Sequence, residues 1–140
     1  MKIINREIGY AIRALCFMVQ QDNKIVTTGQ LADYFNISRP FLRKILQRLN
    51  KAGVLNSYKG KRGGFRLRLA PEQIILADLI EIFQGPVQLS GCYEKGKECP
   101  LMKDCPVKSE LERLGQQFEK ELSNISLDII IQKQNKKKKL

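Results

Sequence analysis

The apolar period of this chain changes from helical to alternating at Gly53, and this change limits the folds that the chain can form. Before Gly53, apolar residues recur every three or four positions, which predicts helices at about residues 7–20, 28–35 and 39–52. After Gly53, Val54 to Tyr58 has the composition of a strand, Gly60 to Gly64 that of a turn, and Phe65 begins a segment of alternating apolar residues. The predicted fold is therefore mainly α with a small β-hairpin.

The remaining residues extend this pattern to the C-terminus. A further helix is predicted over residues 72–84, ended by Gly85 and Pro86. A single long helix is predicted over residues 107–132, and the lysine-rich residues 133–140 are predicted to be a disordered basic tail. Helix, turn, helix and hairpin in residues 1–86 follow the order of a winged helix-turn-helix domain, and residues 87–106 are expected to be a loop that joins it to the long helix.

The positive charge of the chain is concentrated in its first half. The net charge is +11. Residues 1–70 carry 14 Lys or Arg and 3 Asp or Glu, whereas residues 71–140 carry 11 of each kind. A charge that served only solubility would not normally be confined to one half, so the first half is predicted to bind a polyanion.

The second helix of the pair supplies the candidate contacts to double-stranded DNA. A helix fits the major groove, and the residues at its N-terminus reach the base edges. Arg39 and Arg43 are candidate base readers, because arginine pairs with guanine in bidentate fashion. The other predicted DNA-binding residues, mostly phosphate contacts, are Thr28, Ser38, Pro40, Lys44, Lys59, Lys61 and Arg62. The alternative is a small helical domain with a solvated basic face.

The long C-terminal helix carries an apolar stripe of about seven turns, which is more than one small domain can cover. Pairing with the same helix of a second copy would bury the stripe, so a homodimer is predicted, which would present two recognition helices to a two-fold operator. The residues predicted at this interface are Leu111, Leu114, Phe118, Leu122 and Ile125. The alternative is that the helix packs only on its own domain.

Three of the four cysteines lie close together on the loop. Cys92, Cys99 and Cys105 have the spacing C-x6-C-x5-C among charged, small and turn-forming residues. Such thiolates are soft ligands that suit an iron–sulfur cluster or a soft metal ion. The sequence shows neither a signal peptide nor an apolar run near membrane-spanning length, so a cytoplasmic location without membrane association is expected. In that reducing environment, clustered cysteines bind metal more often than they form disulfides. The fourth cysteine, Cys16, flanks the apolar stripe of the first helix and is expected in the core.

Five segments of the chain resemble a known family. They are Tyr10–Leu15, Ile37–Leu46, Ala52–Leu55, Lys61–Phe65 and Ile75–Ile80. Together they are similar to the iron–sulfur winged-helix transcription regulators that include IscR, NsrR and RirA, over about residues 1–120. The resemblance implies a homodimeric transcription regulator, often a repressor. Its cysteine triad would hold a 2Fe-2S or 4Fe-4S cluster that reports iron status, nitric oxide or oxidative stress.

The fourth cluster ligand departs from the family pattern. Some members use a histidine three residues past the last cysteine, but that position is Lys108 and the chain has no histidine. Others take a carboxylate from the first helix of the partner subunit, at the position of Gly9. Glu7 of the partner subunit, two residues earlier, is the candidate in this chain. Three thiolates with one weak ligand favour a labile 4Fe-4S cluster, with 2Fe-2S as the alternative.

The residues alone leave other uses of the thiols open. The same DNA-binding fold could carry a zinc site or a thiol–disulfide switch, or could take its signal from a partner enzyme instead of nitric oxide or oxygen. An electron carrier or redox enzyme fits less well. The chain lacks a histidine, a glycine-rich nucleotide loop and a nucleophile paired with a base. A regulator that is not an enzyme is therefore predicted.

Overall fold

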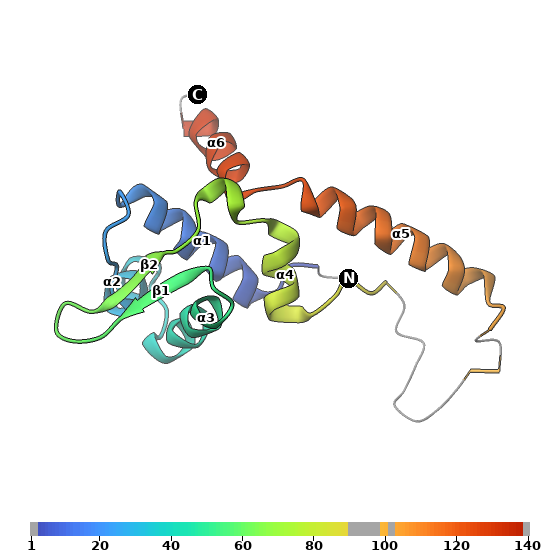
Figure 1. The fold of residues 1–140 in the computed structure, drawn as a ribbon, viewed down its shortest axis with the longest axis horizontal. Helices are drawn as coiled ribbons and strands as arrows, with labels where there is room; N and C mark the ends of the chain where they lie inside the picture. Colours follow the sequence, from blue (N-terminus) through green and yellow to red (C-terminus); the bar gives the residue numbers. More distant parts are fainter. Residues whose placement is uncertain (1–2, 90–98, 101–102, 139–140) are drawn as a thin grey trace.

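The computed structural model describes residues 3–89, 99–100 and 103–138. Its elements are α1 (Arg6–Gln20), α2 (Thr28–Phe35), α3 (Arg39–Lys51), β1 (Leu55–Tyr58), β2 (Gly64–Leu67), the 3₁₀ turn η1 (Pro71–Gln73), α4 (Leu76–Gln84), α5 (Pro106–Ser123) and α6 (Leu127–Lys138). Helices α1 to α4 pack together with the hairpin, while α5 projects away from them (Figure 1). The predicted fold, mainly α with a small hairpin, is confirmed.

Side-chain caps fix the turn between α2 and α3. The Thr27 hydroxyl accepts a hydrogen bond from the Gln30 amide at 3.0 Å, and the Gln30 side chain accepts one from the Thr27 amide at 2.9 Å, forming a capping box. Helix α2 ends at Asn36, whose φ of 54° lies in the left-handed region. The Ser38 hydroxyl then accepts from the Phe41 amide at 3.4 Å and starts α3. These local signals place the second helix directly after the first, as predicted.

The hairpin is tied to the residue that precedes α2. Strands β1 and β2 pair antiparallel, with Leu55 opposite Leu67 and Tyr58 opposite Gly64. Val26 forms an isolated bridge with Phe65, and both of its backbone hydrogen bonds are 2.8 Å long. Gly64 has a φ of +157°, and a Cβ at this position would lie 2.8 Å from the Val26 carbonyl carbon. Only glycine therefore allows this close approach of the two backbones.

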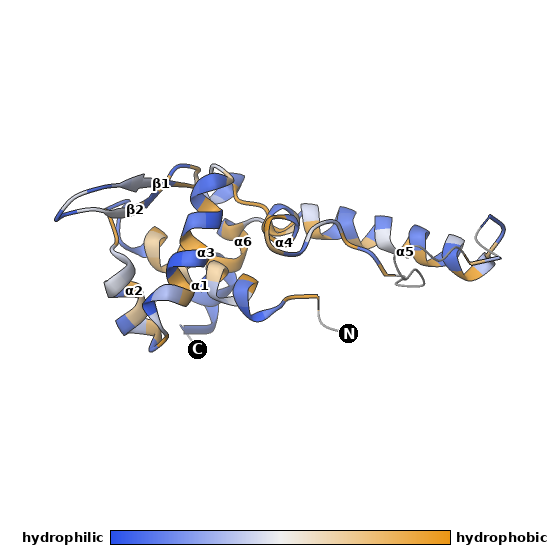
Figure 2. Cartoon of the chain, turned by 90° about the horizontal axis from the view of Figure 1, so that it is seen from below, coloured by the Kyte–Doolittle hydropathy of each residue, from blue (hydrophilic) through white to orange (hydrophobic). Residues whose placement is uncertain are grey.

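Helix α1 lies at the centre of the core. Its inward residues Ile8, Leu15 and Met18 are at most 1% exposed, and they pack in one cluster with Leu46 of α3 and Leu79 of α4. Viewed from below, the helices around α1 carry apolar and polar stripes along their lengths (Figure 2). One core thus holds the helix pair, the hairpin and α4 in a fixed arrangement.

The single helix predicted over residues 107–132 is wrong, because the chain forms α5 and α6 with an extended break between them. The Ile125 carbonyl accepts from the Leu76 amide at 2.9 Å, and the Leu127 amide donates to the Ile74 carbonyl at 2.8 Å. This pairing requires extended backbone, which a continuous helix would not provide. Ser126 then caps the new helix, because its hydroxyl accepts from the Ile129 amide at 3.3 Å.

The structure also corrects two other predictions. The helix predicted over residues 72–84 is split into η1 and α4, because Ile75 is extended and bridges Ser126. Part of the predicted disordered tail is helical, since α6 continues through Lys138.

Within the described ranges, none of the helices combines the length and the apolar character that a bilayer span needs.

Candidate nucleic-acid interface and thiol site

The outward side of α3 is basic. Arg39, Arg43 and Lys44 are exposed on the first two turns, and we refer to these three residues as the basic face. The opposite side of α3 is anchored in the core by four buried residues: Leu42, Ile45, Leu46 and Leu49. Helix α3 itself contains no acidic residue, so nothing within the helix neutralises its basic face. Pro40 is exposed in the first turn, where its missing amide costs no hydrogen bond.

Arg39 lies over the start of the preceding helix. A Cβ placed on Gly29 would be 3.3 Å from Arg39 Nη2, so the guanidinium passes close to the first turn of α2. Thr28 is half-buried in that turn, and Ser38 uses its hydroxyl to cap α3. The structure therefore brings Thr28, Ser38 and Arg39, three of the predicted DNA-binding residues, to the same end of the helix pair.

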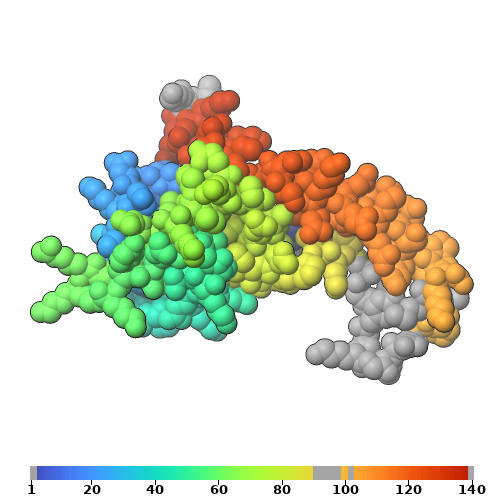
Figure 3. Space-filling view, viewed as in Figure 1, coloured from blue at the N-terminus to red at the C-terminus, as the bar shows by residue number. Residues whose placement is uncertain are grey.

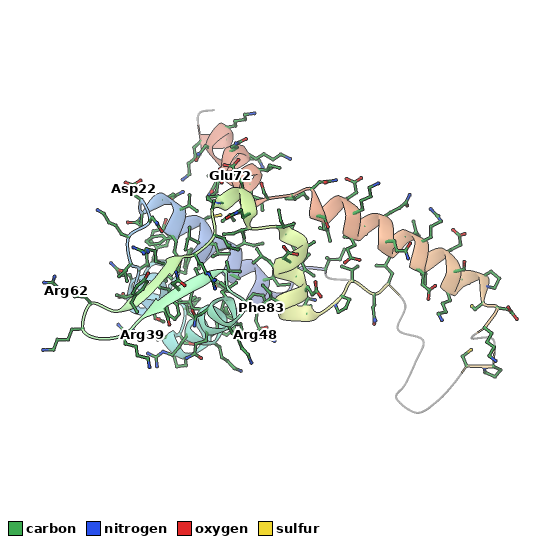
Figure 4. All side chains as sticks on the ribbon, in the orientation of Figure 1. Asp22, Arg39, Arg48, Arg62, Glu72 and Phe83 are labelled. Carbon is green, nitrogen blue, oxygen red and sulfur yellow. The ribbon has the colours of Figure 1, made fainter. Side chains whose placement is uncertain are left out.

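The hairpin supplies the second group of cations. Lys59, Lys61 and Arg62 are all exposed on the turn between β1 and β2. Arg62 extends into solvent at the far end of the hairpin from α5 (Figure 4). The space-filling view shows this tip standing clear of the helical body (Figure 3). The turn itself is closed by a hydrogen bond from the Gly63 amide to the Gly60 carbonyl, at 3.0 Å.

Arg48 has a structural role that the sequence did not reveal. Its Nη1 lies 3.2 Å from Glu7 Oε2 of α1, and its guanidinium carbon lies 5.2 Å from the centre of the Phe83 ring of α4. Figure 4 shows Arg48 and Phe83 next to each other. Arg48 therefore links α3 to both α1 and α4. No sequence signal identifies these contacts, because the partners are 41 and 35 positions away.

Two of the three loop cysteines lie in the described residues. Cys99 is exposed, and Cys105 is half-buried as the N-cap residue of α5. Both are free thiols, and the Cys105 side chain makes no capping hydrogen bond. Cys92 lies outside the described residues. Within the described ranges, no group of three ligand-type side chains gathers to hold a metal ion. The soft, uncommitted thiols of Cys99 and Cys105 suit the chemistry of an iron–sulfur cluster.

Helix α5 exposes an apolar stripe along most of its length. Val107 is 63% exposed, Leu114 is 41% and Phe118 is 38%, and Leu111 is half-buried. The last two predicted dimer residues are placed differently: Leu122 is 8% exposed, and Ile125 packs against the core of its own chain. The free part of the stripe therefore ends near Phe118.

Burial raises the pKa of the Cys16 thiol above its ordinary value of 9.0, as its predicted core position requires. In the unfolded chain, the Cys16 thiol loses its proton near pH 9.0, whereas in the folded chain the thiol keeps its proton at that pH. The contribution of Cys16 to stability is therefore complete below pH 9.0 and is lost as the pH rises through the folded-state pKa. We expect the urea midpoint to fall more steeply above pH 9.0 for the wild type than for Cys16→Ala. Parallel pH profiles of the two proteins would contradict this.

Comparisons with known proteins agree with the arrangement of the helix pair and the hairpin described above. A family model described as "Rrf2: Iron-dependent Transcriptional regulator" matches residues 4–133. Protein aau3 of Rhizobium meliloti (strain 1021) is 27% identical over 91% of this chain and 84% of its own length. An Aquifex aeolicus (strain VF5) protein assigned as an HTH-type transcriptional regulator is 33% identical over 84% of this chain and 83% of its own length.

Solved structures share the fold. CymR, the global cysteine regulator of B. subtilis, superposes with a TM-score of 0.73 at 22% identity, covering 94% of this chain and 98% of CymR. T. potens IscR superposes with a TM-score of 0.67 at 23% identity, covering 95% of this chain and 88% of IscR. The family model spans the helix pair, the hairpin, the thiol loop and most of α6. This chain therefore belongs to the Rrf2 family of transcriptional regulators.

Proposed function

We propose that this Rrf2-family regulator binds its operator as a homodimer, and that an iron–sulfur cluster held by Cys92, Cys99 and Cys105 controls its affinity for DNA. The observation that carries the proposal is the position of Cys105. It is the residue from which α5 starts, and α5 is the helix with the free apolar stripe. A group bound to this thiol therefore acts directly on the helix that we expect to form the dimer.

The DNA contacts follow from the exposed cations. In the proposed complex, the basic face of α3 enters the major groove, and Arg39 and Arg43 contact base edges. Lys59, Lys61 and Arg62 on the hairpin contact phosphates beside that groove. Thr28 and Ser38 lie at the helix ends where backbone amides also face a phosphate. Because both elements pack on one core, their cations approach the duplex together.

A chain of contacts leads from the thiols to the basic face. Helix α5 follows its N-cap residue Cys105, and its last turn is anchored in the core by Leu122. The following residues pair with Ile74 and Leu76 at the start of α4. Helix α4 then contacts Arg48 of α3 through Phe83. We infer that a tilt of α5 is passed through this route to the recognition helix, which changes how the two helices of a dimer fit the operator.

An iron–sulfur cluster, when bound, supplies a centre that reacts with oxygen, nitric oxide or a change in iron supply. The protein contributes three soft thiolates, of which Cys99 is solvent-exposed and hence accessible to a small-molecule signal. Glu7 already forms an ion pair with Arg48 in its own chain. For Glu7 of the partner subunit to serve as the fourth ligand, this pair must open, and a weakly held fourth position suits a labile 4Fe-4S cluster better than a permanent one.

The cluster is tested by the visible spectrum of protein reconstituted anaerobically with iron and sulfide. We expect Cys99→Ala to abolish the visible absorbance, because one of three thiolate ligands is lost. Cys16→Ala is the matched control and should keep the colour, since Cys16 is buried in the core. A colourless wild type contradicts the cluster, and stoichiometric zinc in that protein would support the zinc alternative.

The proposed dimer is tested with Phe118→Glu. A charge on the free apolar stripe would be buried in the dimer without a partner, so we expect the dimer to weaken by about 100-fold or more. Ser109→Glu is the control, because it adds the same charge to the opposite side of α5. Sedimentation velocity measures both variants. Equal effects of the two substitutions, or a monomeric wild type, would contradict dimerisation through this stripe.

A further inference from the structure

A pocket of about 400 Å³ lies between α1, α2 and α6. It is separate from the DNA contacts, because α6 lies on the opposite side of α1 from α3 (Figure 1). Its volume is within the range of small-molecule sites in proteins. The residues that line it are Ile12, Arg13, Cys16, Phe17, Gln20, Tyr34, Phe35, Ile130, Lys133, Gln134, Lys137 and Lys138.

The floor of this pocket is apolar and aromatic. The Phe17 and Tyr34 ring centres are 4.8 Å apart, and those of Tyr34 and Phe35 are 5.0 Å apart in an edge-to-face arrangement. Tyr34 is nevertheless 67% exposed, which is high for an aromatic residue in such a cluster. Ile130 of α6 forms the facing wall. An apolar body placed here would cover rings that are now open to solvent.

The rim of the pocket is strongly positive. Lys133 and Lys137 are one turn apart on α6, and Lys138 follows directly. No ion pair with a described residue engages these three lysines. Like charges one turn apart destabilise a helix slightly, and a bound anion would relieve that repulsion. The lining contains no acidic residue, and burial keeps the Cys16 thiol protonated and neutral at physiological pH.

We propose that this pocket binds an amphipathic monocarboxylate, with its apolar chain against Phe17, Tyr34 and Ile130 and its carboxylate at Lys133 and Lys137. The apolar floor and the cationic rim match the two ends of such a molecule. Neither the described cysteines Cys99 and Cys105 nor the residues of the basic face line this pocket. It touches α2, the first helix of the helix-turn-helix, so it offers this regulator a second input.

The test is isothermal titration of the full-length protein with decanoate. We expect saturable binding of one decanoate per chain, with decanol and decyltrimethylammonium binding at least about tenfold more weakly, because neither presents an anion to the lysines. Lys137→Gln should weaken decanoate binding about fivefold. Lys136→Gln is the matched control on the same helix, and it should bind as the wild type does because Lys136 does not line the pocket.

A second substitution tests the apolar end of the site. Tyr34→Ala removes an exposed ring whose loss should leave the fold intact, and it should weaken decanoate binding while leaving the circular dichroism spectrum unchanged. Three results would overturn the proposal. They are no saturable binding of decanoate, equal binding of the three decyl compounds, and equal effects of Lys137→Gln and Lys136→Gln. A monomer–dimer shift caused by Lys137→Gln, without decanoate binding, would instead assign the pocket to a second copy of the chain.

Discussion

Replacing Arg39 and Arg43 together with alanine is expected to weaken specific operator binding by about 10²- to 10⁴-fold. Each bidentate contact between arginine and a base contributes about 1–3 kcal/mol of discrimination, and the two contributions combine in the double variant. Both side chains are exposed on the first turns of α3, so their removal should leave the fold intact. Binding is measured by fluorescence anisotropy on a duplex selected for tight binding to the wild type.

The control for this experiment removes the same charge elsewhere. Lys24→Ala combined with Lys136→Ala lowers the net charge by the same amount, at two exposed positions away from α3. Such a change weakens binding to all duplexes to a similar small extent, through the general attraction to phosphate. Equal losses for the two double variants on the selected duplex would contradict base recognition by the basic face.

Gly64→Ala is expected to lower the free energy of unfolding by about 2–4 kcal/mol. The added Cβ would meet the backbone of Val26 in a conformation that residues other than glycine rarely adopt. Relief of this clash breaks the two hydrogen bonds, each 2.8 Å long, that join Val26 to Phe65. A small domain has only about 5–15 kcal/mol of stability, so the loss is large. Urea denaturation followed by circular dichroism measures it.

Gly9→Ala is the control for Gly64→Ala. Gly9 lies inside α1, and a Cβ at this position would meet nothing within 4 Å. Alanine has the higher helix propensity, so the variant should gain about 0.5–1 kcal/mol. A loss of stability at Gly64 no greater than the change at Gly9 would show that the close approach to Val26 does not hold the hairpin in place.

The elements that sequence analysis placed correctly are those that depend on near neighbours. The capping residues Thr27 and Ser38 and the left-handed Asn36 act within four positions, so α2, the turn and α3 form where the apolar spacing predicted them. The break between α5 and α6 depends instead on pairing of Ser126 with Ile75, 51 positions earlier. The apolar spacing continues across this break, so periodicity alone predicted one long helix.

The same distinction applies to the candidate site. The family resemblance predicted a winged-helix transcription regulator, and the comparisons confirm a transcriptional regulator of the Rrf2 family; the IscR, NsrR or RirA subtype and the iron–sulfur cluster stay predictions. Exposed cations were predictable, because charge at helical spacing marks an outward face. The role of Arg48 was not, since its contacts with Glu7 and Phe83 exist only once α1, α3 and α4 have packed. Leu122 likewise has the spacing of a dimer residue but is buried in its own core.

The most direct test compares operator affinity with and without the cluster. Anaerobically purified protein is titrated onto the selected duplex before and after iron is removed with a chelator, and Cys99→Ala is carried through the same treatment. We predict that the wild-type Kd changes by at least about tenfold, in either direction, as expected for a typical coupling between two sites, while the variant does not respond. An unchanged wild-type Kd would contradict the claim that a thiol-bound cluster controls DNA binding.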